Sequence, residues 1–375
     1  MLAAGTGASA SASAALIGLP VLAPALRAEY DLSLSEIGVV LSSMWAGPLV
    51  TLLPWGLLAD RIGERLVLAI GLGASGILLA AAGFAPSFVA LTVLLTLAGA
   101  AGVSVNSASG RAVMSWFGPE ERGFALGVRQ TAIPLGGAVA ALALPVLEDA
   151  GGLGAAFLFL AGLAFAGALA GALVIRDRAR EPVEDAVPWT LRDRRLWRLS
   201  LGSGLYLVAQ VALTGFVVLF LHDERGLSNG EAAGVLAALQ VVAVGARIGA
   251  GRWSDLVGSR LRPLRAVGIA IAVTLGLSAA ALDTSLWLLV PGLVIAGAIS
   301  MAWNGLSFTA AAELAGQARS GAAIGLQQTF LSAVGVGVPV AFASTVSVTS
   351  YQVGFALAAL CPLAGWWVLG SLSNR

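Results

Sequence analysis

GLLADRIGER at residues 56–65 is repeated, with changes, as GRWSDLVGSR at residues 251–260. At a shift of 195, Gly56, Asp60, Gly63 and Arg65 of the first stretch match Gly251, Asp255, Gly258 and Arg260 of the second. A second pair of stretches, RGFALGVRQT at 122–131 and SGAAIGLQQT at 320–329, matches at a shift of 198. Segments that recur at a nearly constant shift predict that the chain consists of two repeats.

The composition around these motifs is typical of a membrane protein. Of the 375 residues, 58% are hydrophobic and 11% are charged, whereas a soluble domain is about 45–50% apolar and about 25% charged. This excludes an ordinary cytosolic domain, a disordered chain and, at a net charge of +1, a nucleic-acid partner. One cysteine, Cys361, and one histidine, His222, cannot build a disulfide framework or a cysteine- or histidine-rich metal site. We therefore expect no metal and no cofactor.

Twelve apolar stretches are long enough to cross a membrane, which takes about 20 residues each. They predict helices at 3–26, 36–58, 66–84, 88–115, 121–147, 154–175, 199–221, 230–252, 265–282, 286–312, 320–346 and 351–372. The fold class is therefore an all-α polytopic membrane protein with two pseudo-symmetric six-helix bundles, 1–175 and 199–375, joined by a charged linker at 176–198. Because each half has an even number of helices, the halves are parallel repeats.

The distribution of arginine predicts the orientation. With alternating passes, sixteen of the 21 arginines fall on the side that holds both termini and the linker, two fall on the other side, and three lie within helices. The positive-inside rule therefore places both termini and the linker in the cytoplasm, and the chain in the cytoplasmic membrane.

The doubled pattern resembles the motif between helices two and three of the major facilitator superfamily, and the resemblance covers the whole chain. It implies a twelve-helix secondary transporter that works by alternating access. It also implies a cytoplasmic gating latch formed by Asp60, Arg61 and Arg65, with Asp255, Arg252 and Arg260 as a weaker counterpart. The second copy has Leu256 where the first has Arg61, which leaves that latch incomplete. The alternative is a tight glycine-containing turn whose charges only end the helices.

Three arginines lie within predicted helices, and no carboxylate lies in the middle of one. A charged side chain at this depth is costly, so it indicates a functional site by default. A cavity with uncompensated positive charge attracts anions, and a guanidinium binds a carboxylate through two parallel hydrogen bonds. We predict a substrate site made of Arg129, Asn106, Arg247, Arg111, Gln130, Asn304, Gln328, Gln327, Tyr206 and Gln210. Arg111 and Arg247 could instead bind backbone carbonyls, and Tyr206 could serve packing.

Within the superfamily, the chain is most similar to the small-anion branches. RIGAGRWSD, with Arg247 eight residues before Asp255, resembles the nitrate/nitrite porters, and GRAVMSWFGPEERGFALGVRQTAIPLGG at 110–137 resembles the cyanate permeases. The porters' partner arginine would fall at Leu52 and is missing here. The chain is thus expected to be a monomer that moves a small anion and is not an enzyme. Efflux of hydrophobic, drug-like compounds is the alternative, and a non-transporting membrane sensor is a remote one.

Overall fold

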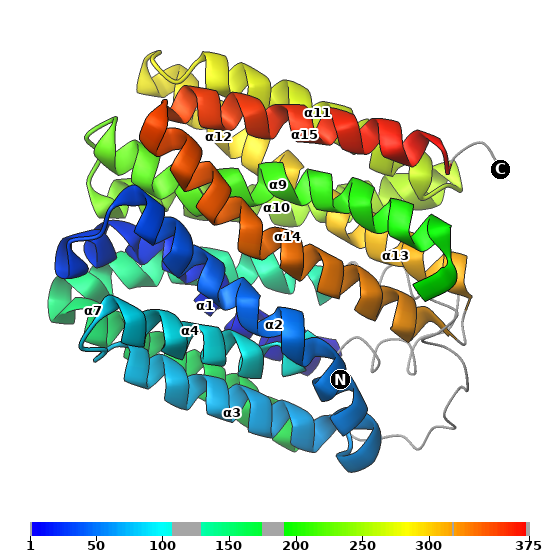
Figure 1. The fold of residues 1–375 in the computed structure, drawn as a ribbon, viewed down its shortest axis with the longest axis horizontal. Helices are drawn as coiled ribbons and strands as arrows, with labels where there is room; N and C mark the ends of the chain where they lie inside the picture. The colour runs from blue at the N-terminus through cyan, green and yellow to red at the C-terminus, as the bar shows by residue number, and fades with distance from the viewer. Residues whose placement is uncertain (1, 107–128, 175–190, 317–318, 373–375) are drawn as a thin grey trace.

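A computed structural model describes residues 2–106, 129–174, 191–316 and 319–372. Within these ranges the chain forms α-helices joined by short turns (Figure 1). The helices are α1 (Leu2–Tyr30), α2 (Leu34–Ile62), α3 (Glu64–Ala82), α4 (Phe88–Gly102), α7 (Ala132–Val174), α9 (Arg194–Asp223), α10 (Asn229–Val257), α11 (Leu261–Ala280), α12 (Leu286–Ser300), α13 (Trp303–Ala315), α14 (Ser320–Val348) and α15 (Tyr351–Gly370).

Helix α7 turns back within its 43 residues. Gly151 and Gly152 leave the helical conformation, and Gly152 adopts a φ of +66°, which glycine tolerates because it has no Cβ. At about 1.5 Å per residue, the 43 residues would span about 65 Å if straight, roughly twice the hydrocarbon core. Eleven described segments are long and apolar enough to cross a membrane. Counting α7 as two passes confirms the predicted all-α, twelve-pass fold.

The internal duplication is visible in the boundaries of the helices. Helices α2 and α10 each have 29 residues, and each begins with a capping box, Ser33 with Glu36 and Ser228 with Glu231. Such a box satisfies backbone N–H groups that a helix start leaves unbonded. Helices α4 and α12 both stop at equivalent positions, with Val103 and Met301 as the residues that end them. The repeats therefore share local structure as well as motifs.

The helices pack as a first half, α1–α7, and a second half, α9–α15 (Figure 1). The two halves meet where α2 contacts α14, where α7 contacts α10, and where α1 contacts α9. We call the end of the bundle at Tyr30–Leu34 the outer end and the end at Ile62–Glu64 the inner end. These names follow the predicted orientation.

Two predicted boundaries are wrong. Asp60 and Asp255 were expected in loops, but α2 continues to Ile62 and α10 to Val257. Both helices end at a glycine with positive φ, Gly63 at 89° and Gly258 at 63°, rather than at the predicted residues 58 and 252. The charge therefore marks where the helix leaves the apolar layer, and the glycine marks where the helix stops.

The second half also begins earlier than predicted. Helix α9 starts at Arg194, inside the predicted linker 176–198, and the side chain of Asp193 accepts a hydrogen bond from the backbone N–H of Arg195 at 2.8 Å. Leu196 and Leu199 are buried, so these residues belong to the packed bundle. Residues 176–190 of the linker lie outside the described residues.

Candidate functional site

Arg247 of α10 joins the two halves close to the middle of that helix. Its Nη1 donates a hydrogen bond to the backbone carbonyl of Gln130, which lies just before α7, and its Nη2 donates to Oδ1 of Asn304 in α13 at 2.6 Å. The side chain of Arg247 is 4% exposed. Both partners are neutral, so the two bonds hold the guanidinium in place without cancelling its charge.

Arg129 lies beside this contact. It directly precedes Gln130 in the chain, and it is 6% exposed. Of the residues predicted to form one substrate site, Arg247 therefore contacts Gln130 and Asn304, and Arg129 is the chain neighbour of Gln130. Arg247 thus bonds to the residue that follows Arg129 in the chain, and both arginines are buried; buried positive charge attracts anions.

The other residues predicted to bind substrate form no hydrogen bond with Arg247 in the part of the chain that the structure describes. The amide oxygen of Gln210 accepts from Trp303 Nε1 at 3.1 Å, and Gln327 Nε2 donates to the hydroxyls of Ser307 and Ser203. These bonds lie inside the second half, where both glutamines are buried. Asn106 and Gln328 are half-buried. Arg111 lies outside the described residues.

Tyr206, also predicted as a substrate residue, packs within the second half. Its ring is fully buried and packs edge-on against Trp303. A Cβ built on Gly268 of α11 would lie 2.1 Å from the Tyr206 hydroxyl, and one built on Gly365 of α15 would lie 2.7 Å from the ring. Two glycines therefore make room for the tyrosine among α9, α11 and α15, helices of the second half, away from the interface between the halves.

The opposite interface, between α2 and α14, is apolar at the corresponding depth. Trp45 packs against Gly335, and the residue equivalent to Arg247 is Leu52, which is buried. Nearer the outer end, the hydroxyl of Ser42 donates to the carbonyl of Val336 at 2.7 Å. The two interfaces are related by the repeat but differ in chemistry, so the candidate site is asymmetric.

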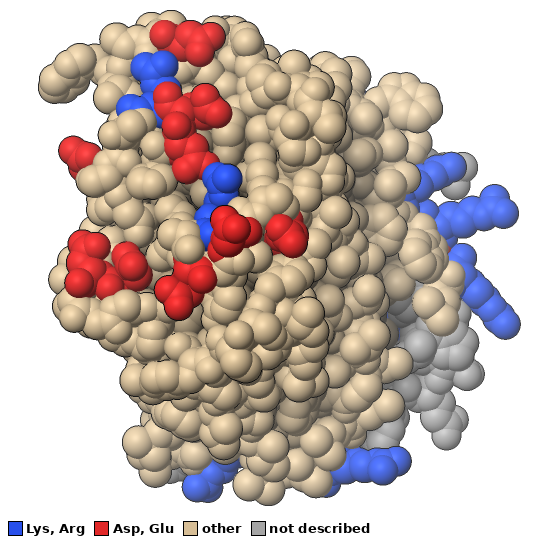
Figure 2. Space-filling model, turned by 60° about the vertical axis from the view of Figure 1, so that its left-hand side comes forward, with Lys and Arg blue, Asp and Glu red and all other residues tan. Residues whose placement is uncertain are grey.

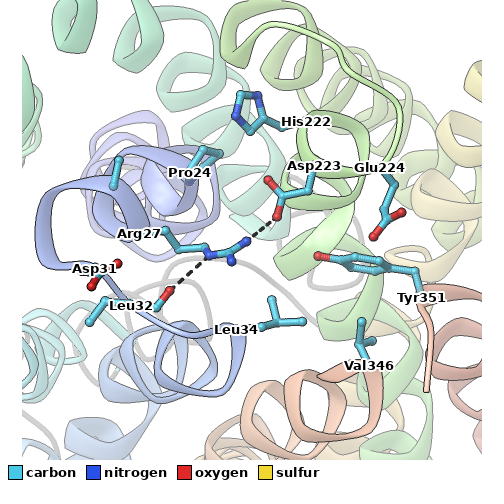
Figure 3. Close-up of a pocket in the computed structure, with 11 residues that line it drawn as sticks. Pro24, Arg27, Asp31, Leu32, Leu34, His222, Asp223, Glu224, Val346 and Tyr351 are labelled. Atoms are coloured by element: carbon cyan, nitrogen blue, oxygen red, sulfur yellow. Dashed lines mark hydrogen bonds and ion pairs between the residues drawn. The ribbon is translucent and has the colours of Figure 1, made fainter. Parts of the chain in front are cut away.

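The outer end is closed by an ion pair between the halves. Arg27, in the last turn of α1, forms a salt bridge with Asp223, the last residue of α9, and its Nε donates to the carbonyl of Leu32 at 3.3 Å (Figure 3). These residues line a depression of about 690 Å³ together with Asp31, His222, Glu224 and Tyr351. Figure 2 shows acidic side chains gathered at this end, with arginines between them. Sequence reasoning missed the pair, because residues 196 positions apart carry no local signal.

We expect the outer closure to weaken in the Arg27→Asp variant, because that change places two carboxylates side by side. A partly exposed ion pair contributes about 1 kcal/mol, which corresponds to about a fivefold change in an equilibrium. With Cys361 replaced by Ala and Ser42→Cys as the reporter, thiol labelling from the outer side should increase by about that factor. Adding Asp223→Arg should restore the closure. Equal labelling of all three proteins would show that the ion pair does not hold the outer end closed.

At the inner end lie the two copies of the repeated motif, in α2 and in α10. Gly56 lies within α2, Arg61 and Arg65 are exposed, and nothing is described of the Asp60 side chain. In the second copy, Arg260 forms an ion pair with Asp255, donates to Glu313 at 3.0 Å and donates to Ser254 at 2.8 Å. Gly251 and Arg252 lie in α10, and Leu256 is exposed. Arg260 therefore ties the inner ends of α10 and α13 together without an arginine at position 256.

These bonds determine how the Arg260 charge behaves. Burial alone would lower the pKa of Arg260, but its hydrogen bonds to Asp255 and Glu313 outweigh burial and raise the pKa above its ordinary value. Arg260 is thus charged at physiological pH, and in this conformation it connects α10 and α13 within the second half.

The comparisons with known proteins agree with this fold. The family model described as Major Facilitator Superfamily matches residues 4–339. An uncharacterized MFS-type transporter of Mycobacterium tuberculosis is 35% identical over 363 residues, which cover 96% of this chain and 81% of that protein. A probable sulfoacetate transporter of Cupriavidus necator is 27% identical over 66% of this chain and 63% of its own length. A hexuronate transporter of Bacillus subtilis is 23% identical over 56% of this chain and 53% of its own.

A solved structure shows the same fold. A bacterial homologue of the human lysosomal transporter Spinster, in an inward-facing and unoccupied conformation, superimposes with a TM-score of 0.76 at 18% identity, over 99% of this chain and 94% of that chain. The family match over most of the chain, the relative at 35% identity and the twelve-pass fold lead to one conclusion. The chain belongs to the Major Facilitator Superfamily of membrane transporters.

Proposed function

We propose that this transporter moves a small organic anion, one that carries a carboxylate or a sulfonate, across the cytoplasmic membrane. The observation that carries this proposal is the buried guanidinium of Arg247, bonded to two neutral groups between the halves and adjacent to Arg129. A guanidinium matches the planar carboxylate, and its charge also suits a sulfonate. The two groups that bond the Arg247 guanidinium are uncharged, so its positive charge favours an anion over a cation.

The named relatives support an organic acid over an inorganic ion. Sulfoacetate and hexuronate, which two relatives are named for, are both small acids with a carbon skeleton. The second arginine that a nitrate site would use is replaced by Leu52. We therefore propose an organic acid as the substrate, rather than an inorganic anion such as cyanate or nitrate.

Alternating access explains how such a site would be reached. In the described conformation the halves meet at the outer end through Arg27 and Asp223 and along the outer parts of α2 and α14. The buried guanidinium groups lie further inward. We propose that separating these outer contacts, while the inner ends approach each other, exposes the same arginines to the other side of the membrane.

Counterflow in proteoliposomes tests the proposal. Vesicles loaded with unlabelled sulfoacetate or hexuronate should accumulate the same labelled anion from outside, with no added ion gradient. A labelled lipophilic cation, tetraphenylphosphonium, serves as the comparison. Accumulation of the cation without accumulation of any organic acid would reject the proposal and favour the efflux of hydrophobic compounds.

A further inference from the structure

Gln240 lies in α10, between the two halves, and its side chain is fully buried. Neither its amide nitrogen nor its amide oxygen has a hydrogen-bond partner among the described residues. A Cβ built on Gly137 of α7 would lie 2.9 Å from the amide nitrogen of Gln240 and 2.8 Å from Ile17 of α1. The amide thus occupies the space that a side chain at Gly137 would fill.

Packing does not require an amide at this position. In the α2–α14 interface, the residue equivalent to Gln240 is Trp45, and the residue equivalent to Gly137 is Gly335. There the indole packs against the glycine, as the amide does here. Because a buried polar group without a partner costs free energy, an apolar side chain would fit this interface at a lower cost than Gln240.

Gln240 also shares a helix face with Arg247. The two residues are seven positions apart, which is two helical turns or about 10 Å along the helix axis. On the facing segment, Gln130 before α7 and Gly137 within α7 are likewise seven positions apart, and they contact Arg247 and Gln240 respectively. The guanidinium and the unbonded amide therefore lie along one line between the halves, with the amide nearer the outer end.

We propose that Gln240 binds a neutral polar group of the transported anion, a hydroxyl or a carbonyl, while Arg247 and Arg129 hold the acid group. The substrate class is then an organic acid with a hydroxyl or carbonyl several carbons away from the acid. In the described conformation Gly137 covers the amide, and substrate reaches it when α7 and α10 separate. This inference rests on the proposed function, and it adds a requirement that an acid group alone does not meet.

The test compares two acids of equal chain length in binding to the purified transporter. Hexuronate carries hydroxyl groups, and hexanoate carries only the carboxylate. Wild-type protein should bind hexuronate about ten times more tightly than hexanoate, because the amide gains partners only with the first. Gln240→Leu should remove this preference and leave the affinity for hexanoate within about twofold. If Gln240→Leu does not fold, Gln240→Met, with a flexible side chain of similar length, is the second variant to test.

Thermal unfolding separates a binding role from a structural one. Without substrate, Gln240→Leu should unfold at a higher temperature than wild type, because it removes an unbonded buried amide. Thr274→Val is the control, since the Thr274 hydroxyl bonds to carbonyls of α11 and the main contacts of α11 are with helices of the second half. It should keep the preference for hexuronate.

Three results would overturn the inference. The first is that wild type binds hexuronate no more tightly than hexanoate, and the second is that both Gln240 variants keep the preference for hexuronate. The third is that the Gln240 variants lose affinity for both acids equally and unfold at a lower temperature than wild type. If wild type binds and exchanges no organic acid at all, the proposed function fails and this inference fails with it. If sulfoacetate is exchanged but hexuronate and hexanoate bind equally, only this inference fails.

Discussion

Arg129→Gln is expected to raise the dissociation constant for the organic anion about ten- to hundredfold, because a buried charge-assisted contact contributes about 1.5–3 kcal/mol. Folding should survive, since the second half already carries Gln327 at the equivalent position. Arg129→Lys should restore little, because an ammonium cannot form two parallel bonds to a carboxylate. Equilibrium binding of labelled hexuronate or sulfoacetate to purified protein measures the effect. Wild-type affinity in Arg129→Gln would place the anion site elsewhere, whereas loss of the protein from the membrane would show that Arg129 is structural.

Arg247→Leu should abolish measurable transport. The variant copies Leu52 of the opposite interface, but it leaves the Gln130 carbonyl and the Asn304 amide oxygen buried without their donor. Each unbonded buried group costs about 1–3 kcal/mol, so a lower unfolding temperature should accompany the lost transport. Counterflow and thermal unfolding of the same preparation measure both effects.

Two further variants make the Arg247 result interpretable. Arg247→Lys keeps the charge but cannot reach Gln130 and Asn304 with a rigid fork, so partial stability and weak transport are expected. Arg262→Gln removes an exposed arginine of α11 and should leave transport normal. Full transport by Arg247→Leu would contradict a substrate-binding role for Arg247.

The fold could be predicted almost completely from the sequence, because membrane helices are defined by hydrophobic length and the duplication repeats their order. The ends of the helices were less predictable. The predicted helices ended at residues 58 and 252, but Gly63 and Gly258, with positive φ, end α2 and α10. In a membrane protein the apolar layer and the helix do not end at the same residue.

The site could be predicted in part. The expected cost of burying charge drew attention to Arg129 and Arg247; both side chains are buried, and Arg247 bonds to Gln130, the residue after Arg129. Tyr206 could not be placed, because its neighbours are glycines of α11 and α15, and a glycine in a sequence does not show what packs against it. The binding role that we propose for Gln240 rests on its lack of partners among the described residues, whereas the difference from its repeat equivalent, Trp45, can be seen in the sequence.

A structure of the transporter determined with bound hexuronate tests the anion site most directly. We expect density between α7 and α10, with the carboxylate within hydrogen-bond distance of Arg129 and Arg247. Density for the acid at any other place, with both guanidinium groups still bonded only to protein, would contradict an anion site built on these two arginines.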